Sequence, residues 1–271
     1  MPTIDLGPLG AVLSPAEAGF AETAGELERL GYSTVWLTGG PMTSLSQVAD
    51  AVRATTRVRI ATGIIPVDAF GADGVASLYG ELEDEQPGRF VVGLGGAHGP
   101  EPLTTLNTYL DRLDRPDGVP RDRRIMAALG PRMLGLARER AAGALPVLVT
   151  PEYVARARRE LGPDSTLAVE QLVVLETDAD RARGLARGPL GFLGQVPAYQ
   201  ASFRRMGFAA EDIDSLGDAL VDGLVAWGDG AALAERVAAL REAGAEHVAV
   251  SVVADGDPTL DQWATVLDAV S

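Results

Sequence analysis

The sequence predicts one closed barrel of alternating strands and helices, a (β/α)8 fold of the TIM type, as a single domain over residues 1–271. Short apolar runs of β-type residues alternate with helical stretches along the whole chain. Eight such units fit a closed barrel better than an open sheet, and apolar strands are typical of a parallel sheet covered by helices. No long linker or shift in composition divides the chain.

In the N-terminal half, apolar runs that stop at glycine or a polar residue predict the strands. Ser14-Pro15 is a helix-start signal and Gly31 a helix-stop signal, so a helix is expected between them. The expected strands here are residues 7–13, 33–37, 58–64 and 90–94, and the expected helices are 14–30, 44–55, 76–85 and 103–113.

In the C-terminal half, Pro131 and Pro151 stand at first helical positions, each directly after an apolar run. The expected strands are residues 125–129, 145–149, 167–175 and 247–253. The expected helices are residues 131–142, 151–161, a helical region that reaches about Met206, then 231–243 and 260–270.

The composition excludes several kinds of chemistry. The chain has 38 acidic residues, 23 basic residues that are all Arg, two His and no Cys. It therefore cannot form a lysine Schiff base or a cysteine nucleophile, and no metal site is expected. The formal net charge of −15 argues against nucleic acid and anionic membranes as partners. The first residues lack the features of a secretion signal, so we expect a cytoplasmic protein.

In a barrel of this kind the functional site lies at the C-terminal ends of the strands. Gly130, Pro131, Arg132 and Met133 follow an expected strand and open a helix. The free N–H groups of such a helix start suit a phosphate, although an ordinary strand-to-helix turn has the same pattern.

His98 is the imidazole expected at a strand end, just after Gly95 and Gly96. It is either an acid or base of the site or a hydrogen-bonded loop histidine. The glycines would let a planar ring approach the backbone. His247 begins the last expected strand, on the face of the barrel that serves stability, and is interpreted as structural.

Glu170 and Gln171 are neighbours within an apolar strand, so one of the two side chains should face the barrel interior. A buried carboxylate without a partner is costly, so Glu170 either pairs with an Arg or has a functional role. Trp36, near the end of the second strand, either walls a substrate pocket or packs in the core.

Segments at these strand ends resemble the bacterial-luciferase-like superfamily, in particular its branch of oxidoreductases that depend on the deazaflavin F420. They occur in family order over most of the chain: LGYSTVW (30–36), ATGI (61–64), PGRFVVGLGG (87–96), AALGPRML (127–134), VTPEY (149–153) and GAEHV (244–248). The resemblance implies a TIM-type barrel, often a homodimer, with the cofactor lying across the strand ends and a small-molecule substrate beside it.

The resemblance also implies roles for particular residues. The cofactor phosphate would lie at residues 130–133, and the ring would lie against Gly63, Ile64, Ile65, Gly95 and Gly96. In similar proteins the turn at residues 63–65 carries a bulge or a non-proline cis peptide. The chain departs from the family after the second strand, where Thr38-Gly39-Gly40 replaces the usual carboxylate or histidine beside the reactive ring carbon.

Two functions follow. The first is an oxidoreductase or monooxygenase that uses F420, or alternatively FMN, to move a hydride to or from a small organic substrate, with His98 and Thr38 polarising the acceptor. The second is a cofactor-free barrel that acts as a lyase, an isomerase or a binding protein through His98 and a strand-end carboxylate. A structural partner subunit is a third possibility, because some members of the superfamily pair with a catalytic sibling.

Overall fold

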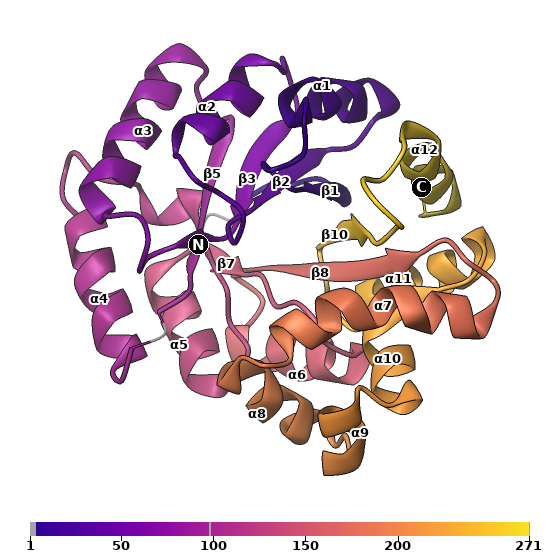
Figure 1. Ribbon diagram of the computed structural model, residues 1–271. Coiled ribbons are helices and arrows are strands. Elements are labelled where there is room, and N and C mark those ends of the chain that lie inside the picture. Colours follow the sequence, from indigo (N-terminus) through magenta and orange to yellow (C-terminus); the bar gives the residue numbers. More distant parts are fainter. Residues whose placement is uncertain (1–3, 98, 271) are drawn as a thin grey trace.

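The computed structural model describes residues 4–97 and 99–270. Its strands form a closed, eight-stranded parallel barrel surrounded by helices, so the predicted fold class is confirmed (Figure 1). The last barrel strand pairs with both the first and the seventh, which closes the sheet. The barrel strands are β1 (Leu9–Leu13), β2 (Thr34–Thr38), β3 (Arg59–Gly63), β5 (Phe90–Gly95), β6 (Arg124–Met126), β7 (Gly143–Ala144), β8 (Thr166–Val174) and β10 (His247–Val252).

Helices follow the strands and cover the outside of the barrel (Figure 1). They are α1 (Phe20–Leu30), α2 (Ser46–Arg53), α3 (Ala72–Glu85), α4 (Pro102–Leu113), the short η1 (Arg121–Arg123), α5 (Pro131–Arg140), α6 (Pro151–Leu161), α7 (Ala179–Leu193), α8 (Pro197–Met206), α9 (Ala210–Ser215), α10 (Asp218–Leu224), α11 (Gly230–Glu242) and α12 (Leu260–Val270). Two short strands lie beside the barrel strands: β4 (Ile65–Pro66) pairs with β5, and β9 (Val225–Trp227) pairs with β8. Within the described ranges, none of these helices is long and apolar enough to cross a membrane.

The structure differs from the expected elements mainly in three places. The first helix was expected from residue 14, but residues 15–19 form turns and α1 begins at Phe20, directly after Gly19 with its positive φ of 73°. The strand expected at 145–149 is shorter and earlier, because Pro146 has no N–H to donate and Leu148 adopts a positive φ of 55°. The helical region expected to end near Met206 is the start of a longer insertion between β8 and β10, which contains α7 to α10 and the unpredicted β9.

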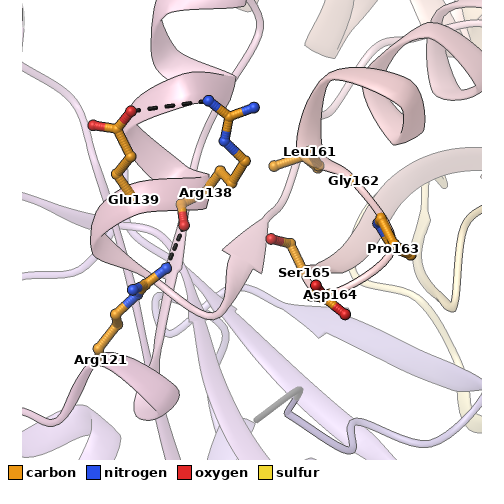
Figure 2. A pocket seen from close by; sticks show the side chains of 8 residues that line it. All are labelled: Arg121, Arg138, Glu139, Leu161, Gly162, Pro163, Asp164 and Ser165. Carbon is orange, nitrogen blue, oxygen red and sulfur yellow. Dashed lines mark hydrogen bonds and ion pairs between the residues drawn. The ribbon is translucent and has the colours of Figure 1, made fainter. Parts of the chain in front are cut away.

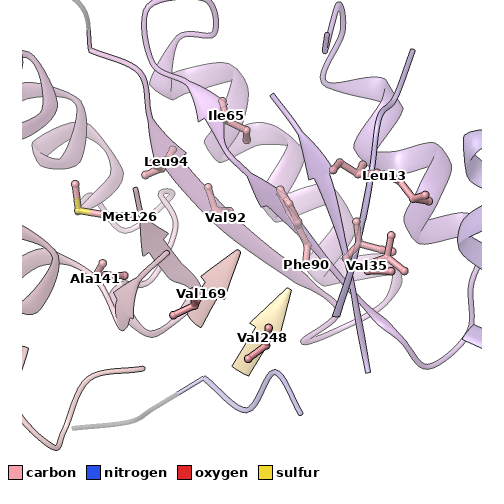
Figure 3. Packing of buried hydrophobic residues seen from close by; sticks show 14 of the residues in the cluster. Leu13, Val35, Ile65, Phe90, Val92, Leu94, Met126, Ala141, Val169 and Val248 are labelled. Carbon is pink, nitrogen blue, oxygen red and sulfur yellow. The ribbon is translucent and has the colours of Figure 1, made fainter. Parts of the chain in front are cut away.

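Strand alternation divides the buried side chains into two sets. The outward set packs against the helices and includes Val35, Phe90, Val92, Val169 and Val248 (Figure 3). The inward set forms a separate cluster inside the barrel, made of Ile4, Leu6, Val12, Trp36, Ala61, Val91, Ile125, Ala142, Leu145, Ala168 and Ala249. The barrel is therefore a packed core and not a pore.

The N-terminal segment closes one end of this interior. Ile4 and Leu6 are buried, the Ile4 N–H donates to Thr166 Oγ1 over 3.1 Å, and Thr34 Oγ1 donates to the Leu6 carbonyl over 2.6 Å. Both threonines lie at the starts of their strands. The segment thus covers the N-terminal ends of the strands, and the C-terminal ends form the mouth of the barrel.

Candidate functional site

The turn after β3 lies at the mouth. Gly63, the last residue of β3, pairs in register with Thr38 at the end of β2. The Gly63–Ile64 peptide bond is cis and lies in the turn where the resemblance implies a bulge or a non-proline cis peptide. A Cβ on Gly63 would meet Leu145, Trp36 and the Glu170 carboxylate at 3.4, 3.6 and 4.0 Å, so these three side chains lie directly beneath the turn.

The glycines after β2 explain the departure from the family pattern there. A Cβ on Gly39 would lie 1.5 Å from the Ile64 carbonyl oxygen and 2.9 Å from the Pro66 ring. No side chain fits at this position, whatever its chemistry, because the β3 turn already fills the space. A Cβ on Gly40 would meet nothing within 4 Å. Gly39 therefore serves the packing of the turn, and sequence alone gave no sign of this contact.

Two glycines at the end of β5 also have structural reasons to be glycine. A Cβ on Gly95 would come within 2.9 Å of Ala127 Cβ and 3.2 Å of Ile64 Cγ1. The missing Gly95 side chain therefore leaves room for Ala127 and Ile64, and the contact of this residue with a cofactor ring stays a prediction. Gly96 follows with a φ of 76°, a left-handed conformation that favours glycine.

Glu170 is the titratable group that faces this region from β8. It lies on the same strand face as Ala168, which belongs to the interior cluster, and is partly exposed. Gln171 faces away and donates from Nε2 to the Leu224 carbonyl over 3.0 Å. Among the described residues, the Glu170 carboxylate has neither an Arg partner nor a hydrogen bond. Burial raises the pKa of this carboxyl to about 7.

Thr38 adds a second unpaired group. It lies on the same face of β2 as Trp36, toward the interior, and its Oγ1 is buried without a hydrogen-bond partner among the described residues. Buried hydroxyls in native proteins usually have a partner, so an orphaned one at a strand end is a candidate ligand contact. Thr38 and Glu170 therefore both lie beside Gly63 without a hydrogen-bond partner among the described residues.

Trp36 and His247 belong to the core and not to this open region. Trp36 is completely buried, which agrees with core packing and not with the wall of an open pocket. Its Nε1–H donates to His247 Nε2 over 2.9 Å, and His247 Nδ1 lies 2.7 Å from the Gly7 carbonyl. Burial lowers the pKa of His247 to about 4. Both ring nitrogens thus have partners suited to a neutral imidazole, in agreement with the structural role expected from sequence.

Residues 130–133 open α5 at the mouth. Gly130 is the residue before the helix, has extended backbone angles, and no side chain caps the first turn. The first helical hydrogen bond is donated by the Leu134 N–H, so the N–H groups of Arg132 and Met133 remain free. Arg132 is exposed. This arrangement can accept an anion.

Arg205 lies beside that helix start and was not identified from sequence. Its Nη2 donates to the Leu129 carbonyl over 3.1 Å and lies 3.7 Å from the Cβ position of Gly130. Arg156 Nη1 in turn lies 3.5 Å from the Arg205 carbonyl. Arg205 belongs to α8, in the insertion whose path the strand pattern does not reveal. His98, the other predicted acid or base, lies outside the described residues.

A cavity of about 430 Å³ lies at the opposite end of the barrel (Figure 2). It is lined by η1, the last turn of α5 and the loop from α6 to β8, all of which precede strands. Its cations are already engaged, since Arg121 donates to the Arg138 carbonyl and Arg138 donates to the Glu160 carbonyl. Among the described residues, no cluster of His, Asp and Glu is arranged to hold a metal ion.

Comparison with known proteins identifies the fold. Neither protein-family models nor curated protein sequences match this chain. An F420-dependent secondary alcohol dehydrogenase, solved with an F420–acetone adduct, matches with a TM-score of 0.74 and 15% identity over 97% of this chain and 99% of that one. The F420-dependent tetrahydromethanopterin reductase of Methanopyrus kandleri matches with a TM-score of 0.73 and 16% identity over 96% of each chain.

A third structure binds a different cofactor. The oxygenating part of 3,6-diketocamphane monooxygenase from Pseudomonas putida, solved with FMN, matches with a TM-score of 0.69 and 13% identity over 97% of this chain and 96% of that one. The chain shares its (β/α)8 barrel fold with these three proteins. The resemblance found in the sequence is thereby confirmed as a likeness of fold, and the proteins that share this fold include two that depend on F420 and one solved with FMN.

Proposed function

We propose that this protein is an oxidoreductase that binds F420, or alternatively FMN, across the mouth of the barrel and acts on a small organic molecule. The observation that carries the proposal is a pair of polar groups beside Gly63: Thr38 Oγ1, which is buried without a hydrogen-bond partner among the described residues, and the Glu170 carboxyl, whose pKa is raised by burial. Native proteins rarely leave such groups unpaired unless a ligand completes them. When bound, the cofactor supplies hydride transfer.

The residues of this chain would hold and orient the bound molecules. The free N–H groups of Arg132 and Met133 would bind the cofactor phosphate, and the backbone of residues 63–65 and Gly96 would support the ring. Thr38 would donate a hydrogen bond to the acceptor, and His98 would share this role. Glu170, whose pKa lies near 7, can give or take a proton close to neutral pH.

The net charge of −15 does not prevent the binding of an anionic cofactor. Arg132, Arg156 and Arg205 lie on neighbouring helices at the mouth, around the start of α5. Charges are screened beyond about 8–10 Å at physiological salt, so this local group of cations outweighs more distant carboxylates.

A cofactor-free lyase or isomerase is the second candidate. The near-neutral pKa of Glu170 favours it, because such a carboxyl suits general acid–base chemistry without a borrowed cofactor. The Gly39 contact weakens one argument for it, since packing against Ile64 accounts for the absent side chain after β2. We also propose the homodimer that the resemblance implies.

A fluorescence titration of the purified protein with F420 and with FMN tests the first candidate. We expect micromolar binding of at least one cofactor and weaker binding by Arg132→Gln, which loses positive charge at the α5 start. Arg159→Gln is the matched control, because Arg159 is an exposed residue near the far end of α6 and the change alters net charge equally. An absence of binding by both cofactors at high concentration would refute the proposal.

A further inference from the structure

The cavity at the N-terminal end of the barrel has a volume of about 430 Å³, which is within the range of small-molecule sites (Figure 2). The proposed function makes no use of it, because the cofactor site lies at the opposite end of the barrel. The cavity is lined by two guanidinium groups, two carboxylates and one serine hydroxyl, which belong to Arg121, Arg138, Glu139, Asp164 and Ser165.

Arg121 is engaged only by backbone carbonyls, which leave its positive charge unneutralised. Its Nε donates to the Ala141 carbonyl over 3.3 Å, and its Nη2 donates to the Arg138 carbonyl. Among the described residues, no carboxylate oxygen lies within 4.0 Å of this guanidinium. Such a cation stands out in a chain with 38 acidic and 23 basic residues. The two carbonyls fix the orientation of Arg121, and its Nη1 keeps its N–H groups for a ligand.

Arg138, Glu139 and Asp164 form the outer part of the lining. Arg138 Nη1 donates to the Glu160 carbonyl over 3.1 Å, and its Nη2 lies 3.9 Å from the Glu139 carboxylate. The side chains of this pair are 53% and 68% exposed, so their mutual attraction is weak. Asp164 is exposed and forms no ion pair with another described residue. A ligand can therefore contact these charges without breaking a strong interaction.

The loop from α6 to β8 supplies a hydroxyl at the base of the cavity. Ser165 is only 5% exposed, and no hydrogen bond of its hydroxyl is found in the described part of the chain. Arg158 Nη1 donates to the carbonyls of Gly162 and Ser165 over 2.9 and 2.7 Å, which holds the loop in place. Figure 2 shows the Ser165 hydroxyl directed toward the wall formed by Arg121 and Arg138. A largely buried hydroxyl without a partner is a candidate ligand contact.

We propose that this cavity binds a small zwitterion of the amino-acid type. The ligand carboxylate would accept hydrogen bonds from Arg121 Nη1 and from the Ser165 hydroxyl. The ligand ammonium group would face the carboxylates of Glu139 and Asp164. This is a second binding site, separate from the mouth of the barrel.

The balance of charge in the lining favours this ligand class. Two guanidinium groups and two carboxylates give the lining a net charge of zero. A ligand with a carboxylate alone would be attracted by the arginines but repelled by Glu139 and Asp164, and the reverse holds for an amine. A zwitterion satisfies both signs at once. Leu161 and Pro163 line the same cavity and suit a hydrocarbon side chain.

Ligand-observed NMR titrations at pH 7 with three matched compounds test this inference on the unmodified protein. The compounds are leucine, 4-methylpentanoate, which lacks the ammonium group, and 3-methylbutylamine, which lacks the carboxylate. We expect leucine to bind about ten-fold more tightly than either analogue, because each analogue loses one charged contact.

Three variants assign the binding to this cavity. Arg121→Gln should weaken leucine binding about ten-fold, and Ser165→Ala, which removes a single oxygen atom, should weaken it about five-fold. Asp164→Asn should lower the preference for leucine over 4-methylpentanoate. Arg204→Gln is the matched control, because Arg204 is exposed on α8, away from this cavity, and the change alters net charge as Arg121→Gln does. It should leave leucine affinity unchanged.

Several results would overturn the inference. One is leucine binding no tighter than that of both analogues, and another is unchanged leucine affinity in both Arg121→Gln and Ser165→Ala. An equal loss in Arg204→Gln and Arg121→Gln would show an effect of net charge and not of a site. Absence of binding at about 10 mM leucine would also contradict a site with a dissociation constant of about 1 mM or less. The cofactor titration concerns the other end of the barrel, so each proposal can fail alone.

Discussion

The two ends of the barrel interior differ in whether their buried polar groups have hydrogen-bond partners. At the N-terminal end, His247 accepts from Trp36 and lies in hydrogen-bond contact with the Gly7 carbonyl, while Thr34 and Thr166 are bonded to the segment that closes the barrel. At the C-terminal end, Thr38 Oγ1 and the Glu170 carboxyl have no partner among the described residues.

Both ends hold an ionisable group whose neutral form is favoured by burial, but the consequences differ. His247 has a lowered pKa and partners that match the neutral ring, so it stabilises the fold. Glu170 has a raised pKa and no partner, so it costs stability when it ionises. This difference agrees with the general rule for such barrels, in which the N-terminal face serves stability and the C-terminal face carries the functional site.

The largest effect should come from Gly39→Ala at the mouth. The new Cβ would lie 1.5 Å from the Ile64 carbonyl oxygen, so the backbone must move, and we expect a loss of about 3 kcal/mol or more in the free energy of unfolding. Urea denaturation measures it. Gly40→Ala is the matched control and should change stability by less than about 1 kcal/mol, since nothing lies within 4 Å of its Cβ. Equal effects of the two changes would contradict the packing of the β3 turn.

At the closed end, His247→Ala should lower the free energy of unfolding by about 3 kcal/mol at pH 7, because it creates a cavity and leaves the Trp36 N–H and the Gly7 carbonyl unpaired. The control is Ser251→Ala on the same strand face, toward the mouth. No hydrogen bond of the Ser251 hydroxyl is seen among the described residues, so this change should cost less than about 1 kcal/mol. If His247→Ala changed the free energy of unfolding only slightly, the stability of the closed end would not depend on this histidine.

The pH dependence of stability should separate the two ionisable groups. Between pH 4.5 and about 7, the Glu170 carboxyl is protonated to a greater extent in the folded protein than in the unfolded chain. The free energy of unfolding therefore falls as the pH rises through this range. A pKa difference of this size corresponds to about 3 kcal/mol. Glu170→Gln should therefore be more stable than wild type at pH 8 and about equal at pH 4, measured by urea denaturation.

The opposite sign applies to His247, whose stabilising effect is lost as pH falls from 6.5 through about 4. Comparing wild type with Glu170→Gln at each pH isolates the carboxyl, since both proteins retain His247. The same change at the exposed Glu22 of α1 is the control and should give no stability gain at pH 8. A Glu170→Gln variant that is less stable than wild type at pH 8 would mean that the carboxylate has a stabilising partner.

The smallest effect should come from Thr38→Val. This change removes an unpaired buried hydroxyl while keeping the side-chain shape, so stability should stay equal or rise by about 1 kcal/mol. Cofactor affinity should fall at the same time. Thr62→Val on the neighbouring strand is the matched control, because Thr62 Oγ1 donates to the Gly93 carbonyl and accepts from the Gly93 N–H. This control should lose about 1–3 kcal/mol. If the two variants behave alike, Thr38 is not an open hydrogen-bonding position.

The sequence predicted those parts of the fold that depend on local pattern. Alternation along an apolar strand predicted that either Glu170 or Gln171 faces the interior, and Pro131 predicted the start of α5. The position of Arg205 beside the start of α5 could not be predicted, because nothing local indicates where a helix in an insertion will lie. The need for glycine at position 39 could not be predicted for a similar reason. The group that excludes a side chain there is the Ile64 carbonyl, which lies 25 residues further along the chain.

The most direct test of the account is a ¹³C NMR titration of the Glu170 carboxyl, assigned by comparison with Glu170→Gln, in the free protein and with F420 or FMN added. We expect this carboxyl to titrate near pH 7 in the free protein, and its pKa or chemical shift to change when the cofactor binds. A carboxyl that titrates at an ordinary pH near 4.5 and does not respond to either cofactor would contradict the claim that the mouth of the barrel is an open binding site centred on Glu170.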